Sequence, residues 1–362
     1  GKFMEQKQQK FFLGANSCNG FVSHFSDSFS AKDGWRAYLI KGGPGTGKSS
    51  LMKYLALRGE EYGEEPILCP CSSDPLSLDG VIFEKRKAVI LDATAPHVVE
   101  PQLPGVCEQI INLGEFWNAD KLRKNSRAVI AAAEKNKGLH KNASAFLRAA
   151  GQVMESSLAL TRPAADTDRI ISAALRCAKR LLPETGKQGS EKIRFLQGIT
   201  PLGIVTYTDT VRNYYPAQVI VSDPYGCVGN VFMQTVREYA LAAGYSIITV
   251  KSAFLPDKIT DHILIPDIGL AFITESPYFR FGGEQRRIHA RRFTDAKKLR
   301  EVKQRLLFRR RVTKELLSAA CETLALAKAS HDELEKYYIS AMDFDRIPPF
   351  AASLAEKIFS EE

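Results

Sequence analysis

The stretch that decides the fold is an apolar run, a glycine-rich loop and the start of a helix: Ala37-Tyr38-Leu39-Ile40-Lys41-Gly42-Gly43-Pro44-Gly45-Thr46-Gly47-Lys48-Ser49-Ser50. Residues 42–49 match the pattern G-x-x-x-x-G-K-[ST] without a mismatch. Such a loop turns successive backbone N–H groups toward phosphate, and the following helix adds its positive N-terminal end. The surrounding strand and helix support the motif. We therefore expect a triphosphate-binding loop here, with a ligand-free glycine-rich turn as the alternative.

Each residue of the loop has an expected role. Lys48 is expected to reach the β- and γ-phosphates, and the Ser49 hydroxyl to ligate Mg²⁺. The nucleotide, ATP on this interpretation, is expected to contact Gly42, Gly43, Pro44, Gly45, Thr46, Gly47, Lys48, Ser49 and Ser50.

An acidic residue ends a second apolar run. Ala88 to Leu91 is followed by Asp92, the form of a strand that presents a carboxylate beside a phosphate-binding loop. Asp92 would hold Mg²⁺ directly or through water. The sequence thus predicts Ser49 and Asp92 as metal ligands, and Lys48 and Asp92 as catalytic residues.

The segment 71–80, Cys-Ser-Ser-Asp-Pro-Leu-Ser-Leu-Asp-Gly, is expected to be a loop at the edge of the sheet where ligands collect. Asp74, a catalytic candidate, or Asp79 could position the attacking water or a second substrate. Helix capping by Ser73 or Asp74 is an equal alternative. His97 could sense the γ-phosphate or simply pack in the core.

The chain has seven cysteines, an odd number, and contains no C-x-x-C pair. This favours reduced thiols and a cytoplasmic location over a disulfide framework. A zinc site formed by Cys69, Cys71, Cys107 and His97 is a weaker alternative, because the spacing differs from the usual structural zinc patterns. Apolar runs are too short to span a membrane, so we expect no membrane partner.

The sequence is a tandem duplication. Several segments recur in the same order at an offset of about 180 residues: Ile67-Leu68-Cys69 with Ile247-Ile248-Thr249, Ala88 to Pro96 with Gly269 to Pro277, and Lys121-Leu122-Arg123 with Lys298-Leu299-Arg300. We assign residues 9–186 to repeat 1 and residues 190–362 to repeat 2, joined by a linker at 183–190.

Each repeat is expected to be an α/β domain with a parallel sheet and a long helical arm, at about 120–182 and about 295–345. The arm is interpreted as an amphipathic helical hairpin that packs on its own sheet or on the other repeat. In repeat 1, strands are expected at 37–40, 66–69 and 88–91 and a helix at 48–57. Gly59 and Gly63 are expected just beyond that helix.

The loop is degraded in repeat 2. Tyr225-Gly226-Cys227-Val228-Gly229 lies over residues 45–49, so valine replaces the lysine and glycine replaces the serine. Ile273 replaces Asp92. Because the lysine charge and both Mg²⁺ ligands are missing, we expect one nucleotide per chain, bound by repeat 1.

Together these motifs resemble an uncharacterised bacterial family of tandem P-loop ATPases. The resemblance rests on residues 41–49, Cys71 to Gly80, Asp92 with Thr94-Ala95-Pro96-His97, Pro104-Gly105 and Asn112 to Glu115. It implies two P-loop-like repeats and binding of ATP, but no settled substrate. In that family the second half can also carry a P-loop, which is degraded here.

Positive charge gathers in two stretches of a chain whose net charge is +9. Residues 120–194 hold 16 Lys and Arg against 7 Asp and Glu, and residues 280–314 hold 14 against 3. Arg291-Arg292, Lys297-Lys298 and Arg309-Arg310-Arg311 could bind an acidic partner or a nucleic-acid backbone, although charge runs on long helices are usually solvated.

Three functions remain open from the sequence. The first is an ATPase whose hydrolysis drives a conformational change, with Arg280, Arg286 or Arg287 as a possible arginine finger from repeat 2. The second is a phosphotransferase acting on a small molecule or nucleotide, with the arm as a lid. The third is an ATP-gated binder of nucleic acid or an acidic protein.

Overall fold

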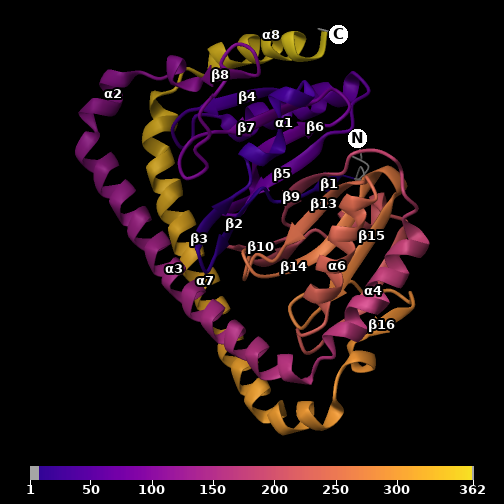
Figure 1. Ribbon diagram of the computed structural model, residues 1–362. Helices are drawn as coiled ribbons and strands as arrows, with labels where there is room; N and C mark the ends of the chain where they lie inside the picture. The colour runs from indigo at the N-terminus through magenta and orange to yellow at the C-terminus, as the bar shows by residue number, and fades with distance from the viewer. Residues whose placement is uncertain (1–7, 361–362) are drawn as a thin grey trace.

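A computed structural model describes residues 8–360 and shows two six-stranded mixed sheets, one in each repeat (Figure 1). The first sheet has the order β1-β5-β6-β7-β4-β8, and the second has the order β9-β13-β14-β15-β12-β16 when read from the matching edge. Corresponding strands therefore occupy the same positions in both sheets. A two-stranded hairpin, β2-β3 or β10-β11, accompanies each sheet, so the duplication seen in the sequence is a duplication of topology.

The strands follow one another in the same order in both repeats, and repeat 2 has an additional short helix, α5, before its β12. Repeat 1 contains β1 (Gln9–Lys10), β2 (Gly14–Ser17), β3 (Gly20–Ser23), β4 (Arg36–Lys41), α1 (Lys48–Glu61), β5 (Ile67–Cys71), β6 (Asp74–Phe83), β7 (Ala88–Asp92), β8 (Glu108–Asn112), α2 (Ala119–Lys124), α3 (Ser126–Thr161) and α4 (Thr167–Leu181). Repeat 2 contains β9 (Ser190–Arg194), β10 (Gln197–Thr200), β11 (Gly203–Thr206), α5 (Thr208–Tyr214), β12 (Ala217–Ser222), α6 (Gly229–Ala242), β13 (Ser246–Lys251), β14 (Thr260–Ile265), β15 (Leu270–Glu275), β16 (Arg287–His289), α7 (Ala296–Ala341) and α8 (Ile347–Ser360).

Neither sheet is purely parallel, which corrects the sequence prediction. β6 runs antiparallel to both of its neighbours, β5 and β7, and β14 does the same between β13 and β15. The expected loop at 71–80 is therefore largely strand. No helix follows Asp74, so the capping alternative for Ser73 or Asp74 is wrong as well. The remaining ladders in each sheet are parallel.

The helix after the glycine-rich loop is longer than expected. α1 begins at Lys48 as predicted but continues to Glu61, with Gly59 inside it and only Gly63 beyond its end. Close packing requires glycine at position 59, because a β-carbon there would lie 2.3 Å from the Phe83 ring. Gly63 has the left-handed backbone, with φ of 80°, that commonly follows a helix.

The two sheets share one hydrophobic core. Alternate residues of a strand point to opposite faces, so Leu39 and Leu91 of the first sheet join Ile220 and Ile273 of the second in a single buried cluster. The other face of the first sheet packs on α1 and α8, and the other face of the second packs on α6 and α4. Each sheet is thus covered by helices on one face, and the two remaining faces line the common core.

The long helices of the two arms pair with each other. α3 and α7 run antiparallel along one side of the molecule (Figure 1), and at 1.5 Å per residue they extend about 54 and 69 Å. The Asn136 amide donates to the Ala327 carbonyl, and Arg309 donates to the Ser156 hydroxyl, 2.7 Å away. The arm is therefore a pair of helices from different repeats, instead of a hairpin within one repeat.

This pairing exchanges the last helix of each repeat. α4, which ends repeat 1 in the sequence, packs with α6 on the second sheet, and α8, which ends repeat 2, packs with α1 on the first sheet. Matching backbone bridges mark the two crossing points, Trp117 with Met342 and Ala165 with Thr294. The sequence prediction missed α8, because the second arm was expected to end near residue 345.

The exchange predicts that residues near the C-terminus stabilise the first sheet. Phe359 is 3% exposed; its ring stacks on that of Tyr62 and meets that of Phe83 edge to face. Replacing it with alanine should lower the free energy of unfolding by about 3 kcal/mol or more, because a buried aromatic side chain leaves a cavity. Urea denaturation followed by circular dichroism measures this. Phe308→Ala, at a position 57% exposed on α7, is the control and should change stability little. Equal midpoints for the two variants would contradict the exchange.

Candidate functional site

The loop between β4 and α1 has backbone geometry suited to an anion. Gly45 and Gly47 have φ of 70° and 92°, the left-handed region where a side chain would be strained. Within residues 8–360, no hydrogen bond uses the backbone N–H of Gly45, Gly47 or Lys48. Unpaired N–H groups at the start of a helix attract a negatively charged group.

Lys48 and Asp92 face each other beside this loop. β4 and β7 are neighbouring parallel strands, with Ile40 paired to Asp92, so the loop and the carboxylate lie at the same sheet edge. The Lys48 ammonium lies 2.8 Å from the Gly43 carbonyl oxygen and 3.7 Å from Asp92 Oδ2. The side chains of Lys48 and Asp92 are 14% and 13% exposed, so both remain accessible to a ligand.

Hydroxyl groups hold the loop in shape. Thr46 donates to the Gly43 carbonyl over 2.8 Å, and Thr94 accepts from the Gly42 N–H over 3.3 Å. The Ser49 hydroxyl accepts from the Leu78 N–H over 2.9 Å, which ties the start of α1 to β6. Thr94 was part of the family resemblance but was not among the predicted site residues. Its contact across 52 residues cannot be read from spacing.

The environment of Asp92 combines burial with a nearby cation. Burial raises the pKa of the Asp92 carboxyl, while the Lys48 ammonium and a hydrogen bond from the Thr94 N–H, 3.0 Å away, act to lower it. The carboxylate thus faces a lysine at the end of a buried strand. This is an arrangement that can hold a divalent cation.

Repeat 2 contributes one wall of the site through α7. A β-carbon on Gly43 would lie 2.4 Å from the Tyr338 ring, and one on Gly45 would lie 2.9 Å from Ile339 and 3.1 Å from Glu335. The glycines of the loop therefore also allow α7 to approach closely. The sequence prediction missed these contacts, because nothing in the sequence indicates that the far end of the second arm meets the first loop.

The two acidic residues of β6 have different surroundings. Asp74 accepts from the Ser77 hydroxyl, 2.8 Å away, and pairs with Lys328 of α7, 3.4 Å away. Asp79 is 4% exposed and pairs with His97, with 3.3 Å between Oδ1 and Nε2. Asp74 therefore contacts the arm, and Asp79 belongs to a buried cluster.

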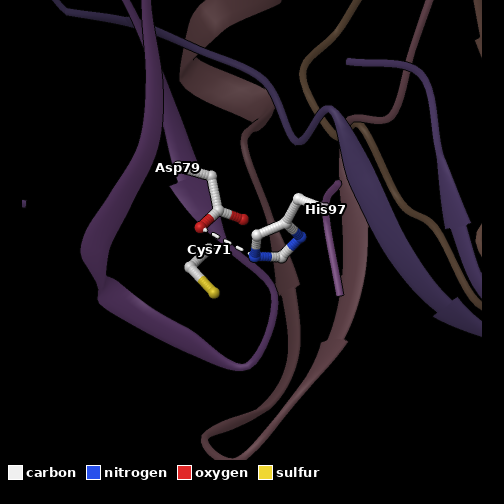
Figure 2. Close-up of side chains that lie close together, drawn as sticks. All are labelled: Cys71, Asp79 and His97. Atoms are coloured by element: carbon white, nitrogen blue, oxygen red, sulfur yellow. Dashed lines mark ion pairs between the residues drawn. The ribbon is translucent and has the colours of Figure 1, made fainter. Parts of the chain in front are cut away.

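The cluster consists of the buried Asp79 and His97 and the partly buried Cys71 (Figure 2). Burial alone would lower the pKa of His97, but the adjacent Asp79 carboxylate, with a smaller contribution from Asp92, raises that pKa. Burial raises the pKa of the Cys71 thiol, and Asp79 raises it further. Two members of the four-residue zinc set, the weaker alternative from the sequence, lie apart from this cluster: Cys69 is in the hydrophobic core, and the Cys107 thiol donates to the Trp35 carbonyl.

The corresponding loop of repeat 2 is filled by a side chain of the protein. The Asp223 carboxylate is buried and accepts hydrogen bonds from four backbone N–H groups, with donor–acceptor distances of 2.7–3.2 Å; the donors are Tyr225, Gly226, Val228 and Gly229. Asp223 stands where repeat 1 has Gly43, at an offset of 180. An internal carboxylate thus occupies the position that a phosphate would take in an intact loop.

A cavity of about 90 Å³ lies beside this filled loop. α3 and α7 contribute Met154, Leu158, Leu306 and Arg310 to its wall, and the second sheet contributes Asp261 and Thr274. Arg310 donates to the Pro224 carbonyl, and Thr161 donates to the Tyr225 carbonyl over 3.1 Å. The arm thus packs against the loop of repeat 2 as it does against the loop of repeat 1.

Arg287, one of the three arginines considered for a transition-state role, is engaged within repeat 2. Arg287 pairs with Glu275, 2.7 Å away, and donates to carbonyls of its own loop. β16 is the edge strand of the second sheet farthest from β9. Within the basic runs, Lys298 donates to the Pro163 carbonyl, and Arg309 and Arg310 also have partners inside the protein.

Comparisons with known proteins identify no relative. No protein-family description matches the chain, and no match is found among curated proteins or solved structures. Among residues 8–360, no helix has the length and apolar character needed to cross a membrane.

The filled loop predicts a stability role for Asp223. Asp223→Ala should lower the free energy of unfolding by about 3 kcal/mol or more, because it leaves several buried N–H groups without an acceptor. Asp223→Asn, which retains one carbonyl oxygen, should lose less. Thermal and urea denaturation measure the effect. Asp209→Ala removes an exposed carboxylate and serves as the control. Stability of Asp223→Ala equal to that of the control would show that the four hydrogen bonds contribute little.

Proposed function

We propose that repeat 1 binds one Mg·ATP and hydrolyses it, and that repeat 2 has no working nucleotide site. The observation that carries the proposal is the arrangement at one sheet edge. The N–H groups of Gly45 and Gly47 have no acceptor within the described residues, and the Lys48 ammonium lies 3.7 Å from Asp92 at the start of α1. This is the set of groups that a triphosphate needs: backbone donors, a mobile cation and a carboxylate for the metal.

The residues present also fit Mg²⁺. This cation prefers oxygen ligands and binds proteins through few side chains together with phosphate oxygens and water. The Ser49 hydroxyl and the Asp92 carboxylate would supply such oxygens, and the bound ion would neutralise charge on the phosphates. Lys48 would stabilise negative charge that develops on the transferred phosphoryl group.

The contact with α7 favours an ATPase that drives movement. Tyr338, Ile339 and Glu335 lie against the glycines of the loop, and α7 runs from there to the cavity of repeat 2. A shift of the loop when the γ-phosphate leaves would therefore act on a helix that spans both repeats. Rigid elements packed against a nucleotide loop transmit such shifts in other switch proteins.

Substitution of the lysine tests binding. Lys48→Ala should weaken Mg·ATP binding by roughly 100-fold, because it removes the ammonium group that would pair with the phosphates. Titration calorimetry measures the affinity. Lys53→Ala, on the same helix with its ammonium directed at the Leu76 carbonyl, is the matched control and should bind normally. Unchanged affinity in Lys48→Ala would refute the proposed site.

Substitution of the carboxylate separates binding from turnover. Asp92→Asn should retain measurable nucleotide binding but lower the rate of ATP hydrolysis by roughly 10²- to 10³-fold, since a neutral amide holds Mg²⁺ poorly. Phosphate release without any added acceptor measures the rate. Wild-type protein that releases phosphate only when an acceptor is supplied would point to a phosphotransferase instead.

A further inference from the structure

We propose that Cys71, Asp79 and His97 form a zinc site with three protein ligands, beside the proposed nucleotide site and distinct from its Mg²⁺ ligands. Their thiol, carboxylate and imidazole ligand atoms all lie within 4.8 Å of one another. Zinc is bound by these three ligand types, and a site with three protein ligands leaves a fourth position for water.

The distances suit a tetrahedral ion. Two nitrogen or oxygen ligands that lie about 2.0–2.1 Å from zinc are about 3.3–3.4 Å apart in tetrahedral geometry. Asp79 Oδ1 and His97 Nε2 are 3.3 Å apart. The Cys71 sulfur lies within 4.8 Å of both the Asp79 and the His97 ligand atoms, so all three can face a common ion.

The surroundings hold the imidazole in place for this role. His97 is 5% exposed and lies against the rings of Phe21 and Phe25, each with centroids 4.9 Å away. Within the described residues its Nδ1 has no hydrogen-bond partner, so its polar contact is made through Nε2. A buried carboxylate is costly unless it is paired or bound to a metal, and zinc would neutralise the Asp79 carboxylate and the Cys71 thiolate together.

The two repeats differ at these positions. Offsets of 180 and 181 place Lys251 over Cys71 and Tyr278 over His97, and the strand register places His262 over Asp79. A lysine and a phenol in place of the thiol and imidazole do not form a zinc site. The repeat that retains Lys48 and Asp92 is thus the one that retains all three ligands.

Binding to the form in which His97 is cationic releases two protons. Coordination replaces the hydrogen of the Cys71 thiol and the Nε2 hydrogen by which His97 faces Asp79. His97 keeps its other proton on Nδ1, and Asp79 binds as the carboxylate.

Metal titration of the whole chain tests the site. Protein freed of metal with a chelator should bind one equivalent of Co²⁺ and show thiolate-to-cobalt charge-transfer absorption, and Zn²⁺ should displace the cobalt. Cys71→Ser should abolish that absorption, and His97→Gln should weaken Zn²⁺ binding by roughly 100-fold or more. Circular dichroism verifies that each variant is folded, and His97→Gln carries the test if Cys71→Ser is unfolded.

Two controls make the outcome specific. Cys107→Ser, which removes another buried thiol of repeat 1, should leave the cobalt spectrum unchanged. Lys48→Ala should also bind Zn²⁺ normally, so the experiment tests the zinc site separately from the proposed nucleotide site. The proposal is overturned if wild-type protein binds no Co²⁺, or if the spectrum persists in Cys71→Ser.

Discussion

Backbone N–H groups that turn inward at the end of a strand favour a negatively charged partner, and only repeat 2 supplies one from its own described residues. In repeat 2 the Asp223 carboxylate accepts four of these hydrogen bonds, so the loop is complete without a ligand. In repeat 1 the matching residue is Gly43, and the N–H groups of Gly45 and Gly47 have no acceptor among the described residues. The exchange of Gly43 for Asp223, together with the loss of the lysine and the serine, thus distinguishes a loop with free backbone donors from one that contains its own anion.

The exchange of helices joins these two loops into one mechanical unit. α7 passes the cavity of repeat 2 and ends against the loop of repeat 1, while α3 runs antiparallel to it. Because α4 and α8 each complete the other repeat's helical layer, neither sheet has its full core without the other half of the chain. A change at the loop of repeat 1 can therefore reach repeat 2 through packed helices, without a flexible linker.

The sequence predicts those features of the fold that depend on the spacing of residues along the chain. The glycine-rich loop, the strand that ends at Asp92 and the tandem repeat are all visible in residue spacing, and the two sheets with their shared strand order agree with them. β6 was missed because Asp74, Pro75 and Gly80 are typical of turns, although Gly80 to Phe83 pair with β7. Burial by neighbouring strands outweighs these local preferences.

The contacts between distant segments could not be predicted in this way. Lys328 and Tyr338 meet repeat 1 only because the arms cross, and an apolar helix face fits either repeat equally well. The pairing of Asp79 with His97 likewise depends on the antiparallel direction of β6. The sequence prediction treated this segment as a loop and so gave Asp79 no fixed neighbour. Only the register of the folded sheet brings these side chains together.

The central claim is that the chain holds one nucleotide, in repeat 1. Its most direct test is the stoichiometry of Mg·ATP binding to the whole chain by titration calorimetry. We predict one nucleotide per chain, because Asp223 fills the second loop. Two nucleotides per chain would show that the second loop also binds phosphate, and none would remove the proposed site altogether.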